Sequence, residues 1–262
     1  MNRRFLSAVA AILLVPAAPA AAQQPKSADA PLFPRAIVIK EHVEQAAAYE
    51  RELAKRYETP APKGENWFAI RKGKSKVLVV AGHATSQTRE GRIKPADRGT
   101  GSLALMLHEL ADATILHVTH QSPSDPNFYD DNDFKKALDR LLAELKPTLV
   151  LDLHASQAAR PYDMDFGTMR GKSLLGRNDL LKSLAEHLRA EGLANFSQDY
   201  FSADGQRTIT RFVVDRKIPC IQCEASATFL RPDGDDLHAH RYAQLLQGLV
   251  RFVRTVDGKP SP

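Results

Sequence analysis

Cysteine is scarce in this sequence, since Cys220 and Cys223 are the only two among 262 residues. A small exported fold stapled by disulfides needs more cysteines than this, so a hydrophobic core must carry the fold. Two thiolates also cannot complete a zinc site of four cysteines. These absences exclude a disulfide scaffold and a four-cysteine zinc site, and they leave open whether the two cysteines are oxidised.

Blocks of like charge, internal repeats and long low-complexity linkers are also missing. The formal net charge is +5, but the basic residues are spread along the chain, which does not favour a nucleic-acid partner. The absence of repeats and linkers favours a single domain. After the first 22 residues, no segment has enough consecutive apolar residues to span a bilayer.

The N-terminal segment, residues 1–22, has the three parts of a secretory signal peptide. Arg3 and Arg4 form a positive region, residues 5–15 are apolar, and small residues ending at Ala22 suit cleavage. A membrane anchor is the alternative, but the apolar run is too short for one. We therefore predict cleavage near Ala22, a periplasmic or secreted protein, and no stable membrane insertion after cleavage.

Cleavage would leave 240 residues with a net charge of +3, because two arginines are removed. Residues 23–40 begin with a stretch rich in glutamine, proline, alanine and serine and are predicted to form a flexible leader. Residues 41–258 are long enough to bury a large core. We predict that they form one α/β hydrolase-type catalytic domain.

Buried apolar runs alternate with amphipathic segments along this domain. The patterns predict strands at residues 76–81, 113–118, 148–153 and 218–223, and helices at residues 41–57, 102–110, 133–145, 179–191 and 236–256. The alternation predicts an α/β three-layer sandwich with a central mixed, mainly parallel sheet. Right-handed crossovers then bring the carboxyl ends of the strands to one edge, where ligands bind in such folds.

Chemically active side chains follow three of these predicted strands. His83 follows KVLVVAG, His154 follows TLVLDL, and Glu224 follows IPCIQC. One such histidine is usually an ordinary loop residue. Three coincidences at one edge of a sheet predict a functional site.

The residue types suit hydrolysis assisted by a metal ion. A catalytic zinc takes three histidine or carboxylate ligands, lowers the pKa of its bound water and polarises a scissile carbonyl. We predict one zinc per chain, held by His83, Glu90 and His154. A separate carboxylate must take the proton of the zinc-bound water, and Glu224 is predicted to be this base.

The acidic ligand has two candidates. Glu90 lies seven residues after His83 and is preferred because it is closer, whereas Asp97 could instead ligate the metal or cap the following helix. Asp152 lies two residues before His154 and is predicted to face the same side of its strand. It either orients the imidazole of His154 or is a buried acid satisfied by the backbone.

Five segments, LVVAGH, LVLDLHAS, DMDFGT, TITRF and IQCEAS, occur in this order within residues 77–230. In this order they resemble the N-formylglutamate amidohydrolase family of the zinc carboxypeptidase-like superfamily. The resemblance implies a phosphorylase/hydrolase-like α/β sandwich, one zinc and cleavage of an amide bond. In the family's pattern, His83 matches the first histidine, His154 the histidine of the D-x-H segment, and Glu224 the glutamate after I-Q.

The resemblance also implies a substrate that carries a carboxylate, which an arginine can bind with two hydrogen bonds. Arg211 matches the arginine of the family's threonine–arginine pair and is predicted to bind substrate or polarise its carbonyl. Asn132 matches the asparagine of an asparagine–arginine pair, although Asp133 stands where the family has arginine. The predicted function is therefore an exported zinc-dependent amidohydrolase acting on an N-acyl amino acid or another small or peptide-like amide.

Two other functions remain as alternatives. A serine hydrolase would need a nucleophile, but Ser86 and Ser156 do not lie in a G-x-S-x-G elbow. A catalytically inactive periplasmic binding protein on the same fold would be consistent with the missing arginine at position 133. The retained histidines and Glu224 favour the enzyme.

Overall fold

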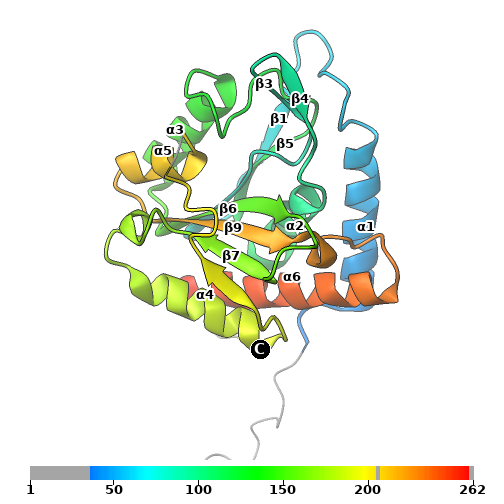
Figure 1. The fold of residues 1–262 in the computed structure, drawn as a ribbon, viewed down its shortest axis with the longest axis vertical. Coiled ribbons are helices and arrows are strands. Elements are labelled where there is room, and N and C mark those ends of the chain that lie inside the picture. The colour runs from blue at the N-terminus through cyan, green and yellow to red at the C-terminus, as the bar shows by residue number, and fades with distance from the viewer. Residues whose placement is uncertain (1–35, 205–206, 260–262) are drawn as a thin grey trace, which may run out of the picture. The chain divides into compact units, whose positions relative to one another are not determined.

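The computed structural model describes residues 36–204 and 207–259 (Figure 1). The predicted signal peptide and most of the predicted leader lie outside the described residues. The end of that leader is fixed, because the backbone N–H groups of Ile37 and Val38 donate to Oε1 of Gln247. Within the described part of the chain, no helix is long and apolar enough to cross a membrane.

A mixed sheet of seven strands lies at the centre, in the order β1-β5-β2-β6-β9-β7-β8. Strands β5, β2, β6 and β9 are parallel to one another and β7 is parallel to β8, whereas β1 and β7 run antiparallel to β5 and β9. The predicted mixed, mainly parallel sheet is therefore confirmed. The strands are β1 (Phe68–Arg71), β2 (Val77–Ala81), β5 (Thr114–Val118), β6 (Leu149–Ser156), β7 (Met164–Gly167), β8 (Phe196–Gln198) and β9 (Cys220–Ser226), with β3 (Gln87–Arg89) and β4 (Arg92–Lys94) forming a separate hairpin.

Helices cover both faces of the sheet, as expected for a three-layer sandwich (Figure 1). One face carries α1 (Lys40–Ala54), α2 (Thr100–Ala111), α4 (Asn178–Ala190) and α6 (Asp236–Val256). The other carries α3 (Asp133–Leu145) and α5 (Ile209–Asp215). Two short 3-10 helices, η1 (Lys172–Leu174) and η2 (Ala227–Phe229), complete the elements within the described residues.

The two helical layers explain why β2 is apolar at every position. Successive side chains of a strand point to opposite faces, so a strand covered on both sides must be apolar throughout. Val77 and Val79 pack in the core beneath α1, α2, α4 and α6, while Leu78 and Val80 pack beneath α3 and α5. All of these side chains are fully buried.

Strands β6 and β9 extend further than the sequence patterns predict. Both were expected to end before their active residue, but the ladder continues and pairs His154 with Glu224 directly across the two parallel strands. The hydrophobic pattern stops where the side chains become polar, whereas the backbone hydrogen bonds continue beyond that point. His154 and Glu224 are therefore held by the sheet itself and not by loops.

Candidate metal centre and pocket

Three adjacent parallel strands deliver the predicted residues to one edge of the sheet. His83 lies two residues after β2, and His154 and Glu224 lie near the carboxyl ends of β6 and β9. Because β2, β6 and β9 are neighbours and parallel, their carboxyl ends meet at the same place. The structure thus brings these three side chains together from distant parts of the sequence.

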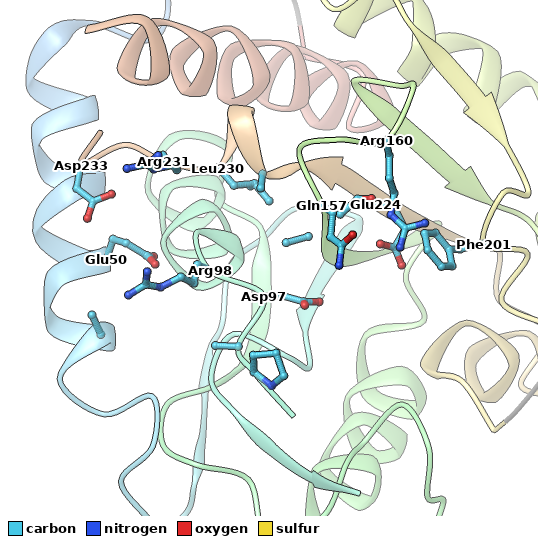
Figure 2. A pocket seen from close by; sticks show the side chains of 16 residues that line it. Glu50, Asp97, Arg98, Gln157, Arg160, Phe201, Glu224, Leu230, Arg231 and Asp233 are labelled. Carbon is cyan, nitrogen blue, oxygen red and sulfur yellow. The ribbon is translucent and has the colours of Figure 1, made fainter. Parts of the chain in front are cut away.

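A cavity of about 700 Å³ opens at this edge (Figure 2). Asp97 and Glu224 both line it. Three arginines also contribute to its wall, and they are Arg98, Arg160 and Arg231. The cavity therefore combines two acidic groups suited to chemistry with cationic groups suited to binding an anion.

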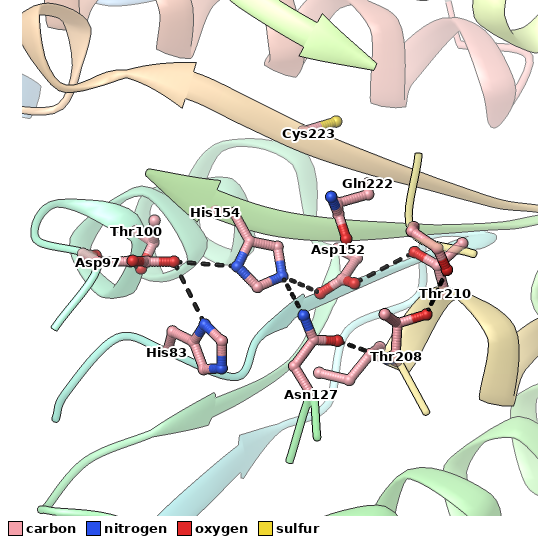
Figure 3. A network of polar contacts seen from close by, with 12 residues as sticks. His83, Asp97, Thr100, Asn127, Asp152, His154, Thr208, Thr210, Gln222 and Cys223 are labelled. Atoms are coloured by element: carbon pink, nitrogen blue, oxygen red, sulfur yellow. Dashed lines mark hydrogen bonds and ion pairs between the residues drawn. The ribbon is translucent and has the colours of Figure 1, made fainter. Parts of the chain in front are cut away.

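Asp97 is the acid beside the two histidines (Figure 3). Its Oδ2 atom lies 2.9 Å from Nδ1 of His154 and 3.5 Å from Nδ1 of His83. One ligand atom from each of the three residues lies within 4.8 Å of the others. Two imidazole nitrogens and a carboxylate oxygen are a donor set that zinc accepts in catalytic sites.

Glu90, the preferred acidic ligand of the sequence analysis, lies elsewhere, and that choice has to be corrected. It is exposed in the turn between β3 and β4, with a φ of 52°, and its backbone N–H donates to the hydroxyl of Tyr129. The hairpin carries Glu90 outward and then returns the chain, so that the Asp97 N–H donates to the His83 carbonyl at 2.8 Å. Proximity along the sequence was misleading because a hairpin separates Glu90 from the site.

Buried carboxylates occupy the far nitrogen of each histidine. Nε2 of His83 lies 2.8 Å from Oδ1 of Asp125, and Nε2 of His154 lies 3.3 Å from Oδ1 of Asp152. Both acids are fully buried. With Nε2 engaged in each ring, Nδ1 of each is turned toward Asp97, and a carboxylate behind the imidazole is typical of histidine metal ligands.

Asp152 faces the same side of β6 as His154, as the alternation of a strand requires. The second carboxylate oxygen of Asp152 accepts a hydrogen bond from Oγ1 of Thr210 at 3.2 Å. A residue of α5 thus helps to hold the Asp152 carboxylate in place. Sequence reasoning missed Asp125, whose other oxygen pairs with Arg89. The available signal was a loop rich in aspartate that follows β5 at the same edge of the sheet.

These acids control the protonation of the histidines. Burial lowers the pKa of His83, but hydrogen bonds with Asp125 and Asp97 outweigh burial and raise it to about 9. Burial also opposes the charge on His154, yet Asp152 and Asp97 raise its pKa well above the ordinary value. The cluster therefore stabilises positive charge strongly, and a cation binding there would replace protons.

Glu224 has a different environment. Burial raises its pKa to about 7, with His154 acting in the opposite direction. Nε2 of Gln222 donates to its Oε1 atom at 3.1 Å. A carboxyl group with a pKa near neutrality can both accept and return a proton at pH 7.

The two predicted substrate residues do not line the cavity. Asn132 caps α3: its Oδ1 accepts from the N–H of Lys135 at 2.9 Å, and its Nδ2 donates to the carbonyl of Tyr129. Arg211 lies on α5, and its guanidinium donates to the carbonyl of Asp204. The role expected for Asn132 is corrected to helix capping, because both ends of its amide are occupied by local backbone.

The cysteines are free and buried in this structure. Cys220 packs beneath α3 and α5, whereas Cys223 packs beneath the opposite helical layer. Two thiols on opposite faces of one strand cannot meet the geometry of a disulfide. The question left open by the sequence is answered by the alternation of β9.

No family model matches the sequence, and no curated protein matches it. Among solved structures, N-formylglutamate amidohydrolase from Ralstonia eutropha JMP134 matches with a TM-score of 0.50 and 12% identity, over 72% of this chain and 97% of that one. A bacteriophage poly-gamma-glutamate hydrolase matches with a TM-score of 0.48 and 15% identity, over 76% of this chain and 91% of that one. The likeness to the Ralstonia protein shows a shared fold, in agreement with the fold that the sequence motifs imply.

Proposed function

We propose that this chain is a zinc-dependent amidohydrolase acting on an N-acyl amino acid or a peptide-like amide. The observation that carries the proposal is the group formed by His83, Asp97 and His154 beside a cavity that Glu224 also lines. The shared fold with an N-formylglutamate amidohydrolase supports an amide as the substrate class. The signal-like N-terminus supports export as part of the same proposal.

The residues present fit a zinc ion. Their donor atoms are close enough to share one ion, and buried carboxylates engage the opposite nitrogen of both imidazoles. When bound, zinc would supply Lewis-acid polarisation of the amide carbonyl and of the attacking water. We assign one zinc per chain, with Asp97 in place of Glu90.

Glu224 performs the proton transfers in this proposal. It accepts a proton as the oxygen of water bonds to the carbonyl carbon, and it returns that proton to nitrogen as the carbon–nitrogen bond breaks. Its pKa of about 7 suits both steps. Asp125 and Asp152 take no part in the proton transfers and keep the two imidazole rings in position.

Metal content and one isosteric variant test the proposal. The native protein should contain about one zinc per chain. Glu224→Gln should keep that zinc and lose about 10²- to 10⁴-fold in turnover of a reactive N-acyl amino acid or peptidoglycan fragment. Glu186→Gln is the matched control, because Glu186 is exposed on α4, outside the cavity.

The outcomes are distinct. Full turnover by Glu224→Gln would reject its role as base, and a native protein that hydrolyses amides without metal would reject the zinc. Ligand binding without any turnover would favour the inactive binding protein, with which the missing arginine after Asn132 would be consistent.

A further inference from the structure

Arg160 is a pocket residue that lacks an anionic partner. It lies in the turn after β6 and lines the same cavity as Asp97 and Glu224 (Figure 2). Among residues 36–204 and 207–259, its side chain has no hydrogen bond or ion pair, and its Nε atom is buried without a partner. The Nε atom is closed to solvent, so an anion in the cavity would be bound by the terminal N–H groups of the guanidinium.

Two aromatic rings hold this guanidinium. Its central carbon lies 4.4 Å from the ring centroid of Phe201 and 5.3 Å from that of Tyr200. Contact of the guanidinium with aromatic rings uses its positive charge and takes up none of its N–H groups in hydrogen bonds. The arginine is therefore oriented before any ligand arrives, which reduces the entropy lost on binding.

The aromatic pair is itself fixed from beneath. Asp165, fully buried on β7, accepts hydrogen bonds from the backbone N–H groups of Tyr200 at 3.1 Å and Phe201 at 2.9 Å. Asp165 stands directly opposite Glu224 in the pairing of β7 with β9. The same pair of strands thus positions both the proposed base and the aromatic pair that holds Arg160.

The other two arginines of the cavity differ from Arg160. Arg98 and Arg231 are exposed, and Figure 2 shows them on the opposite side of Asp97 from Arg160. Water already solvates the charge of an exposed arginine, so an ion pair with a ligand there contributes little free energy. Among these three, Arg160 alone combines partial burial, a fixed orientation and the absence of a partner.

We propose that Arg160 binds a carboxylate of the amide substrate and so determines its specificity. The inference rests on the proposed function, because it names a group of that substrate. An N-acyl amino acid or a peptide end carries such a carboxylate, and the planar guanidinium matches it with two hydrogen bonds. Arg160 then fills the role that the family resemblance assigned to Arg211.

Calorimetric measurement of ligand binding to the zinc-loaded protein tests whether Arg160 binds a carboxylate. The probes are N-acetylalanine, N-acetylglutamate and their C-terminal carboxamides, which differ in the carboxylate alone. The wild type should bind at least one of the acids about tenfold to a hundredfold more tightly than its amide. Arg160→Gln should bind acid and amide equally, and Arg160→Lys should keep only part of the preference. Arg177→Gln, an exposed arginine outside the cavity, should behave as the wild type.

A second variant guards against misfolding of the first. Phe201→Leu keeps the charge but removes the closer ring, so the preference for the acid should fall without disappearing, with a thermal melt confirming the fold. An unchanged preference in Arg160→Gln, or a wild type that prefers none of the acids, overturns the inference. If Arg160→Gln keeps the preference and the wild type hydrolyses amides, the proposed amidohydrolase function would still hold and only the role of Arg160 would be rejected. Loss of preference in a protein without turnover would reject the hydrolase and keep Arg160 as an anion site.

Discussion

The proposed metal centre and the Arg160 region line the same cavity but differ in how their charged groups are paired. In the centre, each imidazole lies between carboxylates, with Asp97 on one side and a buried aspartate on the other. The guanidinium of Arg160 lies against two aromatic rings and has no hydrogen bond or ion pair with the described residues. The histidines that we propose as metal ligands therefore already have acidic partners in the protein, whereas the arginine that we propose for the substrate has none among the described residues.

The largest effect should come from removing the acid shared by both histidines. Asp97→Asn has almost the same shape but loses the charge that faces both Nδ1 atoms, so bound zinc and turnover should be lost together. Zinc measured by atomic absorption and turnover on the same samples check this. Glu90→Gln is the matched control and should keep both, since Glu90 lies exposed in the hairpin turn. The opposite pattern would restore Glu90 as the ligand.

The choice between Glu90 and Asp97 could not be made from the sequence, whereas several elements of the fold could be predicted from it. The bounds of α3 and α6 were predicted correctly, because each begins at a side chain that caps it, Asn132 and Asp235. The gathering of His83, His154 and Glu224 at one edge followed from the parallel topology alone. The edge strands β1 and β8 and their short neighbour β7 were missed, since they are three or four residues long and partly polar.

What remained hidden depends on contacts between distant segments. Asp97 returns to the site only because a hairpin folds out between it and His83. Arg160 looks like any loop arginine until Tyr200 and Phe201, about forty residues later, are seen against its guanidinium. A missing partner is a property of the whole tertiary structure, and no local pattern of residues records it.

A smaller effect is expected from the carboxylate behind His83. Asp125→Asn leaves the imidazole beside Asp97 but weakens the hold on its Nε2 atom, so zinc affinity should fall by about 10- to 100-fold. Competition with a chelator of known affinity measures the change. Asp131→Asn, in the exposed part of the same loop, should leave zinc affinity unaltered. Equal affinities in the wild type and Asp125→Asn would mean that Asp97 alone orients His83.

The smallest effect concerns Glu50, a buried acid of α1 that lines the opposite side of the cavity from Arg160. Its Oε1 accepts the N–H of Gly99 at 2.9 Å and also the hydroxyl of Tyr57, so it steadies the loop that carries Asp97. Gly99 has a φ of 85°, and a Cβ atom there would strike the carbonyl of Leu230. The loop that carries Asp97 therefore requires glycine at position 99, and Glu50 holds the backbone N–H of that glycine.

Burial raises the pKa of Glu50 despite these hydrogen bonds. The folded state thus favours the protonated acid, and this contribution to stability is present below the ordinary pKa and lost as pH rises through the folded value. Glu50→Gln keeps both hydrogen bonds without titrating. Its melting temperature relative to the wild type should therefore rise between pH 4 and pH 7, measured by thermal unfolding at saturating zinc. A difference that shrinks over that range would mean that Glu50 is charged and favourably paired in the fold, as Asp97 is beside the two histidines.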